Sequence, residues 1–133
     1  MTSAYNLAVI LHVLVAILGT GQLGAVAVML AAARRARTPP ADGARAVAPL
    51  LPYVRVSLGL LVLTGVAMDR LASGALHHLW WVRLSFLLVV LEFFLLRRAT
   101  GRLARGGGGL EPLAWSMCGV LGLIAVLMRV KPF

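Results

Sequence analysis

Four long apolar runs constrain the fold more than any other feature of the sequence. They cover about residues 5–33, 50–71, 79–99 and 111–130. An α-helix rises about 1.5 Å per residue, so about 20 residues cross a hydrocarbon core of about 30 Å. Hydrophobic residues make up 61% of the chain and charged residues only 13%, about half the usual share in soluble domains. The pattern predicts an all-α integral membrane protein with one transmembrane domain over residues 1–133.

The segments between the runs read as connections. Pro39, Pro40 and Gly43 predict a loop at "TPPADGARAVAP", because proline and glycine disfavour helix interiors. A short turn, "ASGALHH", and a glycine-rich segment, "TGRLARGGGG", make the other two connections. Small residues at four-residue spacing, such as Thr20 with Gly24, let neighbouring helices approach closely in lipid. We therefore expect an antiparallel four-helix bundle.

Arginines in two of the three connections predict the orientation. Basic residues favour the cytoplasmic side of a membrane protein. That side would be the one with the first and third connections, which places both termini outside a bacterial inner membrane. The start "MTSAYN" lacks the positive region of a cleavable signal peptide, so we expect the first run to persist as a helix. Eight of the 13 basic residues lie in or beside these two connections: Arg34, Arg35, Arg37, Arg45, Arg97, Arg98, Arg102 and Arg105.

The gathering of basic residues in the cytoplasmic connections of a membrane protein also explains the formal charge of +9. No basic stretch is interleaved with aromatic residues in a polar domain, so a nucleic-acid partner is not indicated. The single cysteine, Cys118, excludes an intramolecular disulfide. The sequence shows no nucleophile with a base, phosphate-binding loop or paired carboxylates for hydrolysis or phosphoryl transfer. Catalytic residues, and whether the protein is an enzyme at all, stay open at this point.

Ionisable residues inside a bilayer are costly in free energy, so each one is expected to have a partner or a function. Glu92 lies about five residues before the cytoplasmic end of the third run, and Arg55 about five residues into the second run from the same side. The two should therefore sit at similar depth. We predict a structural ion pair, Arg55–Glu92, between these helices.

The outer half of the predicted bundle collects a different set of residues. His12 lies about two helical turns below the outer surface. The outer connection "ASGALHH" carries His77 and His78. Met68 and Met128 fall in the same layer, as does Arg83 near the start of the third run. An interfacial belt, with Trp80 and Trp81 at headgroup level, explains this layer without any ligand.

Two ligand hypotheses compete with the belt. In the first, haem b or a porphyrin binds with His12 as an axial ligand, a methionine or a second histidine opposite, and Arg83 or Arg129 pairing with the propionates. In the second, His12 and the methionines bind copper, since imidazole and thioether suit that metal. No tight ligand spacing supports a metal site, and a hydrogen-bonded structural role for His12 stays open.

Several motifs resemble a group of small bacterial four-helix membrane proteins. The first run, "LAVILHVLVAILGTGQLG", is similar to the first helix of CopD-like copper-resistance domains, related uncharacterised membrane proteins and the oxygen-independent protoporphyrinogen oxidase family. "LGLLVLTGVAM" and "LWWVRLSFLLVVLEFF" are similar to their second and third helices, and "RVKPF" to their ending. The resemblance covers most of the chain.

Carried over to this sequence, the resemblance implies a haem-binding role for His12 and places the basic residue of the third helix at Arg83. The oxidase family has lysine at that basic position, and a histidine where this chain has Glu92, Phe93 and Phe94. Gly19 replaces an aromatic residue usual after the first histidine. The sequence thus favours a haem- or porphyrin-binding membrane protein with a redox role, with His12, Arg83, Met68, Met128 and His78 as site residues. The alternatives are a copper-handling protein and an accessory subunit packed against a second copy or a larger membrane complex.

Overall fold

The computed structural model describes residues 3–130, and over this range the chain is helical and contains no strand. The prediction of an all-α fold is confirmed. Helices α4 and α1 run a few residues beyond the predicted bounds. The elements are α1 (Ser3–Arg35), α2 (Pro40–Val47), the short 3-10 helix η1 (Ala48–Leu50), α3 (Leu51–Leu71), α4 (Trp80–Ala104) and α5 (Leu110–Val130).

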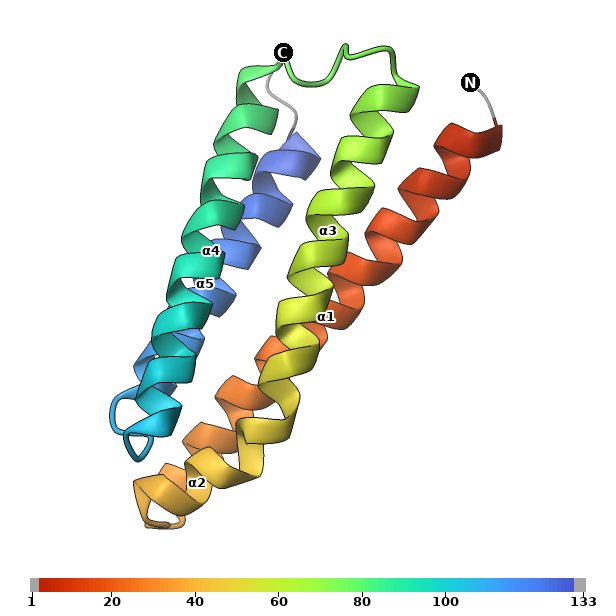
Figure 1. The fold of residues 1–133 in the computed structure, drawn as a ribbon. Coiled ribbons are helices and arrows are strands. Elements are labelled where there is room, and N and C mark those ends of the chain that lie inside the picture. Colours follow the sequence, from red (N-terminus) through yellow and green to blue (C-terminus); the bar gives the residue numbers. More distant parts are fainter. Residues whose placement is uncertain (1–2, 131–133) are drawn as a thin grey trace.

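The four long helices alternate in direction along the chain (Figure 1). The upper end in that view holds the start of α1, the loop over residues 72–79 and the end of α5. The lower end holds α2 and the turn between α4 and α5. Helix α1 leans away from α4 and α5 toward the upper end, whereas the helices converge below. The outer layer predicted from the sequence corresponds to this upper end.

Three helical segments are long and apolar enough to cross a membrane. They are α1, the continuous stretch from α2 through α3, and α5. Helix α4 is not among them, because Arg83, Glu92 and Arg97 interrupt its apolar sequence. A fourth span along α4 stays a prediction.

The loop predicted over residues 38–49 is wrong in part, because Pro40–Val47 forms helix α2. Proline is well suited to the first position of a helix, where no intrahelical N–H bond is required. Gly43 lies where α2 meets the end of α1, and a Cβ there would stand 3.3 Å from that of Ala33. The prolines thus begin a helix that closes the lower end.

The tightly packed core lies in the lower half of the molecule. The buried residues of α1 fall almost entirely after its midpoint, and those of α3 before its own. Along the upper half of α1, Ala8 alone among the described residues is buried. The helices therefore seal against one another below and leave room between them above. The lower core includes Leu23, Val26, Ala27, Val47, Val54, Leu58, Leu96, Leu110, Ala114 and Met117.

Gly19 lies at a close contact between α1 and α3. A Cβ at this position would stand 2.9 Å from the Cβ of Ser57, so one helix has to move to admit it. We expect Gly19→Ala to lower the free energy of unfolding by about 1–3 kcal/mol through overpacking. Gly21→Ala is the matched control, since nothing lies within 4 Å of that position and alanine favours the helix. Equal stability of the two variants in detergent would contradict this helix contact.

Candidate functional site

A cavity of about 1370 Å³ opens between the helices in the upper half of the molecule. Its walls come from all four long helices and from the loop over residues 72–79. Most wall residues are apolar, and the packed core forms its floor, with Leu58, Val89 and Leu121 among the floor residues. Its polar and charged lining residues are His12, Thr20, Ser57, Asp69, Arg70, Ser73, His77, Arg83, Ser85 and Arg129.

His12 is held on the wall of this cavity by a hydrogen bond across the helix pair. Its Nδ1 lies 2.8 Å from the hydroxyl of Thr64 on α3. The next residue, Gly65, lies beside the imidazole: a Cβ there would be in ordinary contact with it, 3.6 Å from Cε1 of His12. Close approach of α1 and α3 therefore sets the position of the ring.

The surroundings of Thr64 decide which nitrogen of His12 carries the proton. The single hydroxyl proton of Thr64 is donated to the carbonyl oxygens of Leu60, at 2.8 Å, and Leu61, at 3.1 Å. Carbonyl oxygens only accept, so while the hydroxyl proton points to one of them, the hydroxyl oxygen is the acceptor for Nδ1–H of His12. In the neutral imidazole this leaves the lone pair on Nε2, which is the usual arrangement of a histidine that binds a metal.

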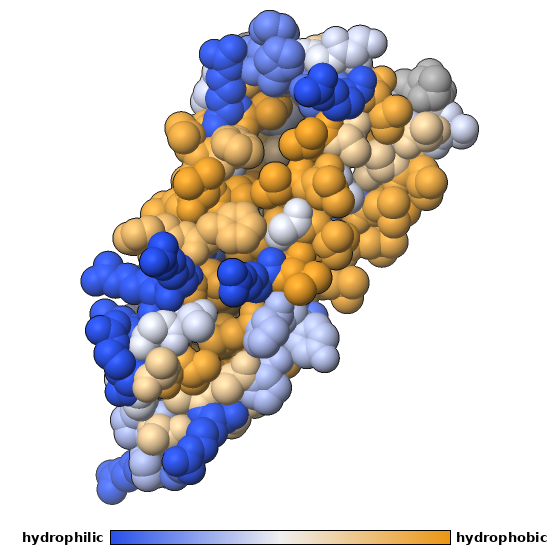
Figure 2. Space-filling view, in the orientation of Figure 1, coloured by the Kyte–Doolittle hydropathy of each residue, from blue (hydrophilic) through white to orange (hydrophobic). Residues whose placement is uncertain are grey.

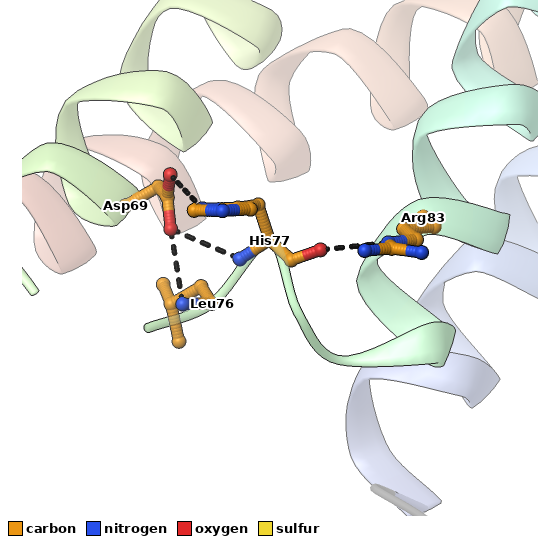
Figure 3. A network of polar contacts seen from close by, with 4 residues as sticks. All are labelled: Asp69, Leu76, His77 and Arg83. Carbon is orange, nitrogen blue, oxygen red and sulfur yellow. Dashed lines mark hydrogen bonds and ion pairs between the residues drawn. The ribbon is translucent and has the colours of Figure 1, made fainter. Parts of the chain in front are cut away.

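At the mouth of the cavity, Asp69 organises the loop that follows α3 (Figure 3). Its Oδ1 accepts hydrogen bonds from the backbone N–H groups of Leu76 and His77, both at 3.0 Å. Its Oδ2 lies 3.1 Å from Nδ1 of His77. In turn, Nε of Arg83 donates to the His77 carbonyl at 2.9 Å. One carboxylate thus links the end of α3 to the start of α4.

This network leaves an excess of positive charge at the mouth. Arg70, Arg83 and Arg129 all line the cavity, against Asp69 as the one acidic lining residue. Asp69 forms no ion pair with any of them, since its contacts go to His77 and the loop backbone. The cavity therefore combines an apolar interior with a cationic rim.

Four of the five predicted ligand-binding residues share this cavity. His12 on α1, Met68 on α3, Arg83 on α4 and Met128 on α5 all line it. His78 does not: its side chain is exposed, and its ring stacks against His77 with centroids 4.0 Å apart. The structure thus gathers residues from four helices around one space, and their roles as ligands stay predictions.

The predicted Arg55–Glu92 ion pair is not formed. Glu92 is completely buried and neither carboxylate oxygen has a hydrogen-bond partner, whereas the side chain of Arg55 is exposed. Glu92 lies on the buried face of α4, whereas Arg55 lies on an exposed face of α3. Glu92 shares the inward face of α4 with Val89 and Leu96, one turn below the cavity floor.

Several residues of the site were missed in the sequence. Thr64 was not singled out, although it is the hydrogen-bond partner of His12. Its polarity within an apolar run, five residues before Asp69, was the available signal. Asp69, Arg70 and His77 fall in the predicted outer layer, but their assignment to a network and a rim required the tertiary structure.

Among residues 3–130, no three His, Cys, Asp or Glu side chains are grouped so that they could hold a metal ion. An axial ligand to haem, or a site built from histidine and methionine, does not require such a group.

The chain matches no protein-family model, no curated protein and no solved structure. The likeness to CopD-like domains and to the protoporphyrinogen oxidase family therefore stays a prediction, and the functional argument rests on the geometry of the cavity.

Proposed function

We propose that this chain is a multi-pass protein of the bacterial inner membrane that binds haem b or a related porphyrin in the upper cavity. The observation that carries the proposal is an apolar cavity whose α1 wall holds one histidine, His12, hydrogen-bonded to a threonine of α3, below a rim of arginines. The supporting argument has three parts, which concern the membrane, the shape of the ligand and the imidazole.

The outer surface of the molecule supports insertion in a bilayer. Each of the four long helices exposes a large apolar side chain at 63% of its full area: Ile17, Leu63, Leu87 and Val130. A broad apolar band crosses the visible face in Figure 2, with hydrophilic groups above and below it. Soluble monomers rarely expose contiguous apolar patches larger than a few hundred square ångströms. Arginines gathered at the lower end favour that end as the cytoplasmic one.

The cavity suits a ligand with an apolar body and an anionic edge. Its volume of about 1370 Å³ exceeds the upper end of the usual range for small-molecule sites, about 1,000 Å³, which leaves space for a large flat molecule. Ala16 and Gly19 reduce the bulk of the α1 wall beside His12. The arginines at the rim complement carboxylates such as the two propionates of haem.

His12 supplies the remaining element. With Nδ1–H donated to Thr64, Nε2 is the nitrogen that would bind iron, and the thioethers of Met68 and Met128, which also line the cavity, would be the further candidate ligands. Bound haem would supply one-electron transfer. The chain's own residues hold the imidazole, shield the macrocycle in the apolar walls and neutralise the propionates.

A spectroscopic titration tests the proposal. Protein purified in detergent is titrated with haemin, and the visible spectrum is recorded in the oxidised and reduced states. We expect a saturable, one-to-one Soret band with a submicromolar dissociation constant. Free haem spectra at all ratios would refute haem binding. The parallel titration with Cu(I) addresses copper, which His12, Met68 and Met128 favour as a second candidate; saturation by copper alone would replace the haem proposal with it.

Removing the Thr64 hydroxyl tests the role assigned to it. Thr64→Val keeps the size of the side chain but leaves Nδ1–H of His12 without its acceptor. We expect haem affinity to fall about 10- to 100-fold, as is usual when a hydrogen-bond partner of a metal-binding histidine is lost. Thr20→Val is the matched control, because it removes a threonine hydroxyl from the cavity wall that makes no contact with His12 among the described hydrogen bonds. An unchanged affinity in Thr64→Val would show that Thr64 does not position the imidazole.

A further inference from the structure

A second hollow lies at the opposite end of the molecule, where α4 ends. Arg98, Arg102 and Arg105, with Gly108 of the following turn, line a space of about 380 Å³. The three arginines recur at intervals of four and three residues, so they lie along one face of the helix. This set of residues is called the arginine hollow below.

No acidic side chain neutralises the arginine hollow. The chain contains four acidic residues, and the structure accounts for all of them elsewhere. Asp42 pairs with Arg45, Glu111 pairs with Arg34, Asp69 binds His77, and Glu92 is buried without a partner. The negative end of the α4 dipole corresponds to about half an elementary charge, which offsets only a small part of three guanidinium groups.

Backbone contacts hold two of these guanidinium groups in place. Nη1 of Arg102 donates to the Gly108 carbonyl at 3.2 Å, and Nε of Arg105 donates to the Gly101 carbonyl at 3.2 Å. Gly109 has a φ of +70°, and a Cβ there would collide with the Arg102 guanidinium. The glycine-rich turn is thus fitted around Arg102. Each guanidinium has five N–H groups, so most remain available to an anion.

An exposed apolar stripe leads from the hollow along the same face of α4. Leu91 and Phe94 precede Arg98 at intervals of three and four residues, they are 41% and 60% exposed, and neither lines the upper cavity. Figure 2 shows hydrophilic groups over the lower part of α4, directly below the apolar band. A cationic pocket therefore continues into a surface that suits hydrocarbon chains.

We propose that the arginine hollow and this stripe bind an anionic phospholipid, with its phosphates among the guanidinium groups and an acyl chain along α4. Guanidinium groups bind phosphate oxygens in pairs, and three of them favour a headgroup with two phosphates over one with a single phosphate. Basic pockets at the cytoplasmic ends of membrane helices are suited to such headgroups. The inference depends on the membrane insertion proposed above and is independent of haem, which is assayed at the other end.

Native mass spectrometry of the full chain in detergent tests this proposal with three probes. Cardiolipin has two phosphates and acyl chains, phosphatidylcholine has chains without net charge, and inorganic phosphate has charge without chains. We expect cardiolipin to bind at least about tenfold more tightly than phosphatidylcholine. Millimolar inorganic phosphate should not displace it. Equal binding of the two lipids, or displacement of cardiolipin by phosphate, would overturn the proposal.

A charge-matched pair of variants localises the site. The triple variant Arg98→Gln, Arg102→Gln, Arg105→Gln should lose the preference for cardiolipin. The control triple variant Arg35→Gln, Arg37→Gln, Arg45→Gln removes the same charge at the same end of the molecule and should keep it. Circular dichroism verifies that both variants remain helical. If both variants lost the preference for cardiolipin equally, the preference would depend on net charge alone, and the assignment to the arginine hollow would be overturned.

Discussion

Replacing His12 with alanine is expected to abolish the Soret band of the haem complex. The substitution removes the imidazole that lies on the α1 wall of the cavity and that is proposed to bind the iron. We expect the affinity for haemin to fall by at least about 100-fold, more than the loss of a supporting hydrogen bond would cause. The measurement is the same spectroscopic titration, carried out on the folded variant in detergent.

Two comparisons separate a lost ligand from a damaged fold. His78→Ala also removes one imidazole, but from an exposed ring outside the cavity, so its titration should match that of the native chain. Free imidazole added to His12→Ala should restore part of the Soret band, since the substitution leaves space where the ring stood. A spectrum that survives in His12→Ala, or is lost equally in His78→Ala, would remove His12 from the site.

Replacing Glu92 with leucine is expected to stabilise the protein. A buried carboxyl group whose two oxygens lack hydrogen-bond partners has lost its hydration without compensation. Leucine is of similar size and suits the neighbouring Val89 and Leu96. We expect the free energy of unfolding to rise by about 1–3 kcal/mol, measured by denaturation in mixed micelles.

The sign of this change distinguishes the observed structure from the ion pair predicted in the sequence. Breaking a buried ion pair would destabilise the protein by several kcal/mol, the opposite result. Arg55→Gln should change stability by no more than about 0.5 kcal/mol, because the side chain is exposed. The double variant should be additive, since the two residues make no contact. A destabilised Glu92→Leu variant would show that Glu92 has a partner.

Much of the fold was predictable from the spacing of apolar residues. The lengths of the four runs predict four long helices, and short connections predict their alternating direction. The ends of α3 and α5 differ from the predictions by about a residue. Helix α2 was missed because proline and glycine were taken as breakers, whereas Pro40 begins a helix and Gly43 allows it to pack. Propensity alone does not distinguish these roles, since position within the helix decides them.

For the candidate site, the sequence predicted how far along its helix each residue lies, but not which face of the helix carries it. Counting residues from the ends of the runs places His12, Met68, Arg83 and Met128 in one layer, and all four line the cavity. The same counting predicts that Arg55 pairs with Glu92, and this prediction is wrong because Glu92 has no hydrogen-bond partner. Depth follows from a fixed rise per residue, whereas the face that a residue presents depends on how the helices rotate against each other.

By itself the sequence determined the helical class, the order and length of the long helices, and the concentration of arginine at one end. These properties follow from local chemistry, because hydrogen bonding within each helix and the apolar length of each run do not depend on distant residues. The tertiary structure decided that α1 leans away from α4 and α5 toward the upper end, that Thr64 contacts His12, and that Glu92 is left unpaired. Such features arise from contacts between helices, where one close approach sets which side chains meet and where a cavity remains.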